Sequence, residues 1–386
     1  MCRALIISPS YLDSAVVPIL RSVRRRQVLL NSLRRERGEI VAMDTKIIDP
    51  LRDPEWDRLV ISHPHYTVFH GSAWAKVLSR TYKHEPFYLC CGDPSEPEAL
   101  IPMMEVQSPF TGRRGVCLPF SDFCDPLIFR KSGSLPAIEG FSEIAQRRKW
   151  KYFEIRGGVT FMPSRRPAAA FYGHRLDLRG GIDKVYAGLK SSVRGAIRKA
   201  ERSGLSLQVS HSLDAIETFY SLHARTRRSH GLPPQPASFF LNIYNEVIEP
   251  GFGFVVLASN GSRPISAAVF FHFGKKAIWK FGASDERLKD LQGNTLVAWE
   301  AISFLARAGI EELHFGRTAL ENEGLRKFKL AWGVKEDAIE YIRFHLAPRL
   351  WVTDGQTRSR FHTAAFRRLP LVVNRLIGTV IYPHLD

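Results

Sequence analysis

Long hydrophobic runs are missing from this chain of 386 residues, because no stretch reaches the roughly 18 apolar residues that a membrane-spanning helix needs. Cysteine is scarce as well. The five cysteines, Cys2, Cys90, Cys91, Cys117 and Cys124, form neither a C-x-x-C pair nor a Cys/His spacing of the kind that binds zinc. A small, odd number of cysteines is typical of buried thiols in a reducing compartment. We therefore expect a cytoplasmic protein without a metal site.

Several functional signatures are absent too. The sequence contains no G-x-G-x-x-G and no G-x-x-x-x-G-K-[ST], which argues against a dinucleotide-binding Rossmann domain and against a P-loop. No Ser/His/Asp or Cys/His arrangement stands in a convincing context. Helix-turn-helix and zinc-finger spacings are also missing, so DNA is not an expected partner.

What the chain has instead is positive charge. Its 55 Lys and Arg residues outnumber 38 Asp and Glu residues, which gives a net charge of +17 and a pI near 9.9. Residues 1–42 contribute +5 and residues 346–386 contribute +4, which leaves +8 for the part between them. A basic core favours polyanionic partners such as tRNA, a nucleotide diphosphate or an anionic bilayer. Solubility alone is the alternative explanation.

The two ends differ in character from the rest. In residues 1–42 seven of the eight arginines follow the apolar stretch 15–20, which is the wrong order for a signal peptide, and we expect a disordered extension. Met43 is an alternative start, because the periodic pattern begins just after it. Residues 346–386 interleave apolar residues with arginine, which predicts a basic amphipathic tail. Such a tail either lies on the inner face of a membrane or docks on the neighbouring lobe.

Between the ends, helical and strand-like segments form two similar units. The first, residues 43–170, is predicted to contain helices over 54–61, 74–82 and 135–149 and strands over 87–91, 99–106, 115–118 and 152–155. The second, residues 171–345, is predicted to contain helices over 191–202, 213–230, 236–247, 295–308 and 323–332 and strands over 175–178, 206–210, 253–258, 264–273, 277–282, 312–315 and 339–344. Strands and helices without regular βαβ alternation indicate an α/β fold of the α+β kind, with mixed sheets. We expect two tandem lobes with a cleft between them.

One cationic cluster runs along a predicted helix of the second unit. Lys190, Arg194, Arg198 and Arg202 repeat every four residues and so form one positive stripe. Such a stripe could contact phosphates, and the alternative is an ordinary solvated helix face.

A second cluster ends the next helix. Arg225, Arg227 and Arg228 stand just before the Pro-rich loop at 233–236, where the helix must stop. Three arginines beside a rigid loop could clamp a diphosphate. The alternative is that they only complement the negative end of the helix dipole.

Two other places could hold reacting groups. Gly293 and Asn294 begin a helix, whose N–H groups can bind an anion, although the pyrophosphate loop of coenzyme A enzymes is reduced here to the single glycine. Lys329 lies on a short helix among aromatic residues and could stabilise an oxyanion or hold a phosphate. The alternative is that its stem packs on Trp332 and its ammonium reaches water.

The order of these pieces resembles the Fem family of peptidoglycan aminoacyl ligases, in the FemAB-like branch associated with exopolysaccharide or exosortase systems. The matching pieces are Leu118-Pro119-Phe120-Ser121-Asp122 and Asp125-Pro126 in the first unit, and Ser191-Ser192-Val193-Arg194, Ala200-x-x-x-Gly204, Thr226-Arg227…Gly231, Gly282-Ala283-Ser284, Asn294, Trp299-Glu300, His314-Phe315-Gly316-Arg317, Phe328-Lys329 and Trp332-Gly333 in the second. The resemblance covers about residues 45–345.

This resemblance implies two GNAT-like lobes that transfer an amino acid from aminoacyl-tRNA to an amine of a peptidoglycan precursor. It implies that Lys329 and Phe328 lie at the reacting carbonyl and that an arginine of the 225–228 cluster binds substrate phosphate. Further substrate-binding candidates are Arg194, Arg198 and Arg317, and Gly293 and Asn294 are candidates for the donor side. The acyl donor is then a co-substrate and not a permanently bound cofactor. The helical hairpin that some members use for tRNA is missing, and no general base is evident.

Three functions stay open. The first is an N-acyltransferase of cell-wall or exopolysaccharide biogenesis, which acts on an amine of an anionic cell-envelope precursor with aminoacyl-tRNA as donor. The second is a GNAT N-acyltransferase that uses acetyl-CoA or another acyl thioester. The third is a non-catalytic scaffold in polysaccharide export. The basic core and the reduced pyrophosphate loop favour tRNA as the source of the acyl group.

Overall fold

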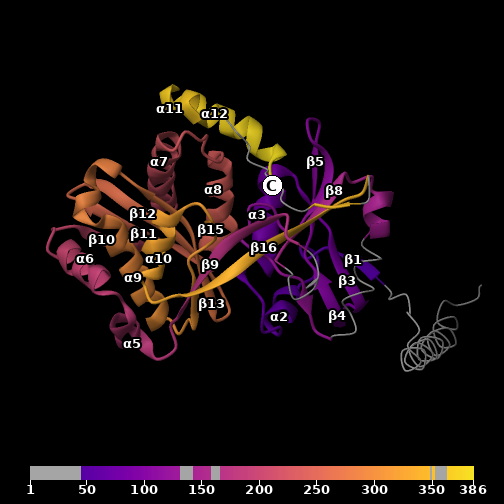
Figure 1. Cartoon of the computed structure of the whole chain (residues 1–386), viewed down its shortest axis with the longest axis horizontal. Coiled ribbons are helices and arrows are strands. Elements are labelled where there is room, and N and C mark those ends of the chain that lie inside the picture. Colours follow the sequence, from indigo (N-terminus) through magenta and orange to yellow (C-terminus); the bar gives the residue numbers. More distant parts are fainter. Residues whose placement is uncertain (1–44, 131–141, 158–165, 348–349, 353–362) are drawn as a thin grey trace, which may run out of the picture.

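The protein is described from a computed structural model, which covers residues 45–130, 142–157, 166–347, 350–352 and 363–386. Two lobes lie side by side, and each consists of β-strands with helices packed on them (Figure 1). The predicted mixed α/β fold is therefore confirmed. The predictions for residues 1–42 and for Met43 concern residues outside these ranges.

The first lobe combines a small antiparallel sheet with one end of a larger sheet. The small sheet has the order β1 (Thr45–Ile48), β3 (Tyr88–Asp93), β4 (Glu96–Ile101) and β7 (Leu127–Ile128). The first lobe's strands of the large sheet are β8 (Tyr152–Arg156), β6 (Gly112–Val116), β5 (Met104–Ser108) and β2 (Glu85–Pro86). Its helices are α2 (Trp56–Ile61), the 3-10 helix η2 (Val68–His70) and α3 (Ser72–Tyr82). They bury large side chains such as Trp56, Phe69 and Trp74 in the core.

One strand prediction in this lobe is wrong. The apolar run 99–106 is not one strand, because it is divided between β4 of the small sheet and β5 of the large sheet. Pro102 lies at the break, and a proline has no N–H with which to continue a ladder. Of the predicted helix 135–149, residues 142–147 are helical and residues 135–141 lie outside the described ranges.

The second lobe holds the rest of the large sheet. Its strands follow the order β10 (Ser206–Ser210), β11 (Gly253–Asn260), β12 (Arg263–Phe273), β13 (Lys276–Ser284), β14 (Glu312–His314), β9 (Ala169–Asp177) and β16 (Lys335–His345). Two short strands pair at its border, β15 (Thr318–Ala319) with β9 and β17 (Leu350–Trp351) with β16. Its helices are α5 (Gly181–Gly188), α6 (Ser191–Glu201), α7 (Leu213–Ser229), α8 (Ala237–Ile243), the π-helix η4 (Tyr244–Ile248), the 3-10 helix η5 (Glu286–Leu291), α9 (Gly293–Arg307) and α10 (Glu323–Leu330).

The alternation of side chains along β12 separates two cores. Ala268 and Phe270 face α5, α6 and α9, whereas Val269 and Phe271 face α7, α8 and the first lobe. The second of these cores therefore continues from one lobe into the other.

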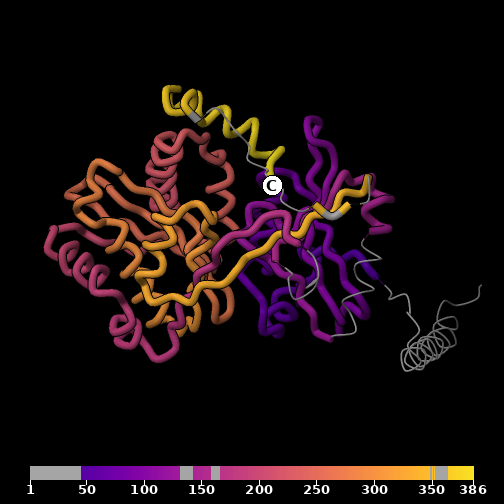
Figure 2. The backbone as a smooth tube through the Cα atoms, viewed as in Figure 1, coloured from indigo at the N-terminus to yellow at the C-terminus, as the bar shows by residue number. Residues whose placement is uncertain are grey.

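Strand β16 joins the two lobes. Residues 335–341 pair with β9 of the second lobe, and residues 341–345 pair with β8 of the first. Figure 2 shows this segment running from one lobe into the other. The large sheet is consequently continuous, where tandem lobes alone would allow two separate sheets. The predicted cleft is nevertheless present, next to this crossing strand.

The C-terminal residues dock on the body of the protein. Helices α11 (Thr363–Arg368) and α12 (Leu371–Ile381) and the 3-10 helix η6 (Tyr382–His384) lie across both lobes (Figure 1). Of the two alternatives for the tail, docking is the one observed here. No helix in the described part of the chain is long and apolar enough to cross a membrane.

Candidate functional site

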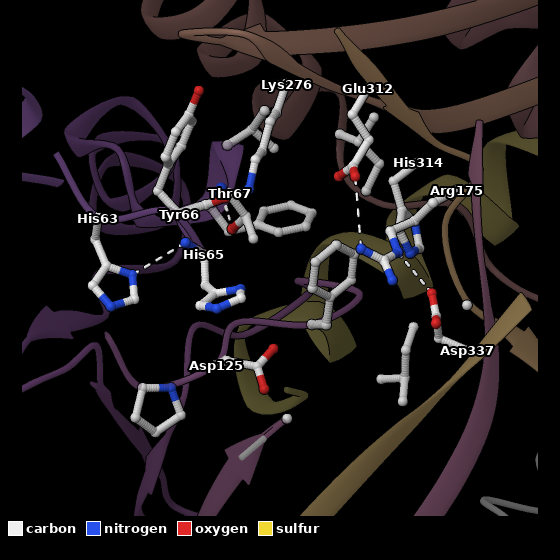
Figure 3. A pocket seen from close by; sticks show the side chains of 18 of the residues that line it. His63, His65, Tyr66, Thr67, Asp125, Arg175, Lys276, Glu312, His314 and Asp337 are labelled. Atoms are coloured by element: carbon white, nitrogen blue, oxygen red, sulfur yellow. Dashed lines mark hydrogen bonds and ion pairs between the residues drawn. The ribbon is translucent and has the colours of Figure 1, made fainter. Parts of the chain in front are cut away.

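A cavity of about 830 Å³ opens between the lobes (Figure 3). The first lobe contributes the turn from His63 to Phe69 and the segment from Phe123 to Ile128. The second lobe contributes the start of β13, parts of β14 and β9, and the crossing strand β16. A cavity between two domains with both apolar and charged walls is the usual form of a small-molecule site.

Charged groups line this cavity, and one of them reaches across it. The Arg175 guanidinium lies between Asp337, at 2.6 Å, and Glu312, at 3.6 Å. Lys276 donates from Nζ to the carbonyl oxygens of Pro64 (2.7 Å) and Tyr66 (3.1 Å) of the other lobe. Burial lowers the pKa of Lys276. The contacts of Lys276 join the two walls of the cavity, whereas the Arg175 pairs lie along the wall formed by the second lobe.

His314 presents a single nitrogen to the cavity. It lies on β14, and its Nδ1 accepts a hydrogen bond of 2.9 Å from the N–H of Gly316. Burial, together with the charge of Lys329, lowers the pKa of His314 to about 3, against an opposing influence of Asp122. The neutral ring must then carry its proton on Nε2. His314 is therefore a neutral hydrogen-bond donor.

Gly173 keeps the space beside that nitrogen open. A Cβ atom at this position would lie 3.2 Å from Nε2 of His314 and 2.9 Å from Cδ1 of Ile339. Gly173 and both neighbours line the cavity. The absence of a side chain thus leaves Nε2 accessible to a bound group.

Asp122 is the central acid of the interface. Its Oδ2 accepts from Lys280 Nζ at 2.6 Å, and its Oδ1 accepts from the Arg317 N–H at 3.2 Å. Burial alone would raise the pKa of Asp122, but Lys280 and Arg317 outweigh it and hold the pKa at about 2. The carboxylate is therefore ionised at any physiological pH.

The loop that carries Asp122 is strained. Leu118 and Phe120 both have positive φ, at 45° and 60°, although neither is a glycine. The carbonyls of this loop are held by the rest of the site: Phe120 O accepts from Lys280, and Asp122 O accepts from the Tyr341 hydroxyl at 2.7 Å. Strain of this kind persists where the surroundings over-determine the backbone, typically at functional sites.

A bulge aims Lys280 at this loop. The register of β12 and β13 shifts between Val269, which pairs with Phe281, and Phe270, which pairs with Trp279, so that Lys280 is the extra residue. Its ammonium is buried. Burial lowers the pKa of Lys280, whereas the nearby charge of Asp122 acts to raise it.

Lys329 is buried beside the same network. Its Nζ donates to the carbonyl oxygens of Gly316 (2.9 Å) and Arg317 (3.3 Å), just past the end of β14. Burial lowers its pKa to about 8, although Asp122 acts in the opposite direction. With 5% of its surface exposed, Lys329 does not extend its ammonium into water, contrary to one of the two alternatives.

The neighbours of Lys329 form an aromatic wall. Phe328 packs edge-on against Trp279 and Trp332 at centroid distances of 6.3 and 6.1 Å. Parallel pairing of β13 with β14 ends at Ile278 and His314, just before this wall. The predicted pair Phe328 and Lys329 therefore lies where these two central strands separate.

The Arg225–Arg228 cluster lies elsewhere. Arg227 donates from Nη2 to the Tyr382 hydroxyl at 2.8 Å, and Arg228 donates from Nε to the carbonyl of Arg367 at 3.4 Å. Both partners belong to the C-terminal segment. Arg225 is exposed and contacts Ser221 of its own helix at 3.2 Å. Two of the three arginines thus hold the tail.

The stripe on α6 is likewise used locally. Arg194 donates to the carbonyls of Ala187 (3.2 Å) and Leu189 (2.8 Å) at the end of α5. Arg198 is exposed and lies 3.5 Å from the Tyr186 hydroxyl. Arg317, by contrast, lies at the interface, where its guanidinium stacks over Phe171.

The start of α9 brings together pieces of the Fem-like pattern. The Asn294 side chain bonds to the hydroxyls of Ser266 (2.6 Å) and Ser284 (3.2 Å). Thr226 Oγ1 accepts from the N–H of Ser284, also at 3.2 Å. Gly293 is buried against Ser266, where a Cβ would approach to 3.0 Å. The structure brings these residues together near the end of β13, whereas the cavity lies at its beginning.

Sequence reasoning missed several residues of the site. His314 and Asp122 stood in the quoted motifs without an assigned role, and Lys280, Gly173 and Arg175 were not singled out. The alternation of β13 would have drawn attention to a lysine between two aromatic residues, Trp279 and Phe281. Within the described residues, no group of three or more His, Cys, Asp or Glu side chains could hold a metal ion.

Comparison with known proteins agrees with this architecture. Residues 187–329 match the family described as "Acetyltransferase (GNAT) domain". A search of curated proteins found no match.

Solved structures with the same arrangement include FemX, at 15% identity and a TM-score of 0.61 over 77% of this chain and 97% of that one. A tandem GNAT protein from the clavulanic acid biosynthesis pathway, solved without AcCoA, is 10% identical with a TM-score of 0.53 over 79% and 98%. The C-terminal domain of a putative lysylphosphatidylglycerol synthetase from Agrobacterium fabrum is 14% identical with a TM-score of 0.50 over 70% and 86%. At these identities the structures show a shared fold. Together with the family match, they place a GNAT acyltransferase domain in the second lobe of a tandem GNAT-like architecture.

Proposed function

We propose that this acyltransferase moves an acyl group onto an amine of an anionic cell-envelope or exopolysaccharide precursor, with aminoacyl-tRNA as the donor. The observation that carries the proposal is the buried Lys329, with a pKa of about 8, whose Nζ donates to the carbonyls of Gly316 and Arg317. These two residues follow His314, which lines the cavity and presents a neutral donor to it. The proposed compartment is the cytoplasm, where both substrates would be at hand.

The proposed reaction needs a group that stabilises negative charge and a surface that orients the acceptor. The acceptor amine attacks the carbonyl of an activated ester, the carbonyl oxygen gains negative charge, and the alcohol of the donor leaves with the proton that the amine loses. Lys329 and the Nε2–H of His314 are the groups of the site that would stabilise this charge. The cavity orients the acceptor, which lowers the entropic cost of the reaction.

Two features favour aminoacyl-tRNA as the donor. They are the net positive charge of the chain and the loop before α9, which keeps only one glycine of the loop that binds the coenzyme A pyrophosphate. The net charge of +17 favours a polyanionic donor such as tRNA. In the loop before α9, Arg287 is paired with Asp285 at 2.8 Å. An acyl-CoA donor is the second candidate, because the family match is to an acetyltransferase domain.

The test is mass spectrometry of envelope precursors from cells with and without the protein. An added aminoacyl mass supports the proposal, and an added acetyl or longer acyl mass supports the acyl-CoA alternative. Purified protein is then given the labelled precursor with aminoacyl-tRNA or with acyl-CoA. If neither donor gives product and no precursor changes mass, transfer is excluded in favour of the scaffold in polysaccharide export.

A further inference from the structure

Helix α12 docks with its small and polar residues toward the protein. Gly378 is buried beneath the carbonyl of Pro234, where a Cβ atom would approach to 1.9 Å. Asn374 is buried as well, and its Nδ2 donates to Phe366 O of α11 at 2.8 Å. Arg375 lies over the ring of Tyr220 on α7. The fully buried positions of the helix are therefore the small Gly378 and the polar Asn374.

The residues after α12 are anchored in both lobes. The Tyr382 hydroxyl contacts Arg227 (2.8 Å) and the carbonyl of Pro233 (3.2 Å) in the second lobe. Asp386 accepts from Arg114 (2.8 Å) and Tyr152 (3.0 Å) in the first lobe. These contacts prevent α12 from rotating to hide its outer face.

That outer face is apolar. Val372, Leu376 and Val380 are 67%, 63% and 64% exposed, and their spacing of four residues puts them in one row. A helix that docks on a water-soluble body normally buries such a row. An exposed apolar row on a docked helix is typical of an interaction surface.

The row continues into the first lobe. Phe110, at the tip of the hairpin between β5 and β6, is 76% exposed, and its ring lies 4.9 Å from that of His384. The hairpin and α12 lie on the same side of the molecule (Figure 1). We call Phe110, Val372, Leu376 and Val380 the outer apolar strip.

Positive charge accompanies the strip. Arg367 and Arg368 at the end of α11 are exposed, and the sequence from 363 to 385 contains no acidic residue. Arg225 and Arg113 are exposed nearby in the chain segments that contact the tail. An apolar row with cations and no acids complements the surface of an anionic bilayer, whose acyl region takes the apolar side chains and whose phosphates take the arginines.

We propose that the outer apolar strip inserts into the interface of an anionic lipid bilayer, with Arg367 and Arg368 at the lipid phosphates, so that the protein binds the membrane peripherally. The proposal depends on the docked tail alone and not on the acyl-transfer activity. It assigns one orientation, in which the side of the molecule formed by α12 and the β5–β6 hairpin faces the lipid.

The test is co-sedimentation of the full chain with vesicles of phosphatidylcholine alone and with added phosphatidylglycerol. We expect binding to the anionic vesicles that weakens as salt is raised. The variant Val372→Ser/Leu376→Ser/Val380→Ser should bind at least about tenfold more weakly. The variant Arg367→Gln/Arg368→Gln should bind more than about tenfold more weakly at low salt, since each cation near an anionic surface contributes roughly a factor of five. The matched control Leu207→Ser/Leu320→Ser changes two exposed leucines away from the strip and should bind normally.

Circular dichroism and size-exclusion chromatography with light scattering accompany each variant. Equal binding of the strip variant and the control overturns the proposal. It is also overturned if the strip variant binds vesicles normally but converts a dimer into a monomer, because the strip would then be a contact between two copies of the chain. Loss of vesicle binding in a folded, otherwise unchanged strip variant supports it.

Discussion

The two groups of cations that the sequence brought forward, Lys329 and the Arg225–Arg228 cluster, have opposite surroundings in the structure. Lys329 is buried, bonds to two backbone carbonyls and lies in a network with Asp122, Lys280 and His314 that joins the lobes. Arg227 and Arg228 bond to the C-terminal segment. The neighbouring arginines Arg227 and Arg228 thus hold the C-terminal segment on the second lobe. The buried surroundings that lower the pKa of Lys329 are instead built from residues far apart in the sequence.

The largest expected effect tests the network across the lobes. Asp122→Ala removes the partner of the Lys280 ammonium, which is 7% exposed. Because an unpaired buried charge is costly, we expect the free energy of unfolding to fall by about 3–5 kcal/mol. Urea denaturation measures it. The matched change Asp177→Ala breaks an exposed pair with Arg179 and should cost only about 0–1 kcal/mol. If both variants lost the same free energy of unfolding, the buried Asp122–Lys280 pair would contribute no more to stability than an exposed ion pair.

The second largest effect is expected for substitutions of Lys329. Lys329→Ala should lower kcat by roughly 10²–10³, as expected for removal of one group that stabilises the oxyanion. Lys329→Arg should recover little, because a planar guanidinium does not replace a compact ammonium. Because the lysine is buried, the alanine variant should also lose about 1–3 kcal/mol of stability from the unpaired carbonyls. Transfer assays measure kcat, and denaturation followed by circular dichroism measures the free energy of unfolding. Lys327→Ala, on the exposed side of the same helix, should keep normal activity, and a normal Lys329→Ala variant would remove this residue from the mechanism.

The pH dependence of stability and of kcat separates the effect of the Lys329 charge from the effect of its side-chain shape. Burial lowers its pKa from 10.5 to about 8, so the folded protein releases a proton before the unfolded chain does. Between about pH 8 and 10.5 the unfolded state therefore binds more protons, and wild-type stability should rise with pH relative to Lys329→Met. In the same range kcat should fall as the ammonium is lost. The residual activity of Lys329→Arg should lack this fall, and a fall that is identical in both proteins would assign it to another group.

The smallest effect concerns the arginine cluster. Arg227→Ala removes the bond to Tyr382 and should lower stability by about 0.5–1.5 kcal/mol and make the tail more sensitive to proteolysis. Arg225→Ala, an exposed position, should leave stability unchanged. If Arg225 binds substrate phosphate, as the Fem resemblance implies, KM should rise in this variant. Thermal denaturation, limited proteolysis and KM measurements distinguish these roles.

The periodic elements could be predicted from the sequence. The helices around α6, α7 and α9 and the strands around β11 and β12 follow from spacing, because their apolar residues repeat with one period over a long segment. Helix α5 was not predicted. It begins at Gly180 and Gly181, both at positive φ, and a pair of glycines is more typical of a turn than of a helix start.

The site was predictable only in part. Lys329 and Phe328 came from the Fem resemblance and from their aromatic neighbours. The state of His314 could not be predicted, because it depends on one backbone N–H two residues away and on the burial of the ring. The Asp122–Lys280 pair joins residues 158 positions apart through a bulge, and bulges leave no clear mark in a single sequence.

The crossing strand β16 also has a mechanical consequence. Because residues 335–341 are hydrogen-bonded to β9 and residues 341–345 to β8, the lobes can rotate against each other only if the strand bends near Tyr341 or one of its backbone ladders breaks. Opening the cavity by rotation of whole lobes would therefore deform the large sheet, whereas movement of side chains and turns at its rim would not. A gap held in this way favours a bound group of matching thickness.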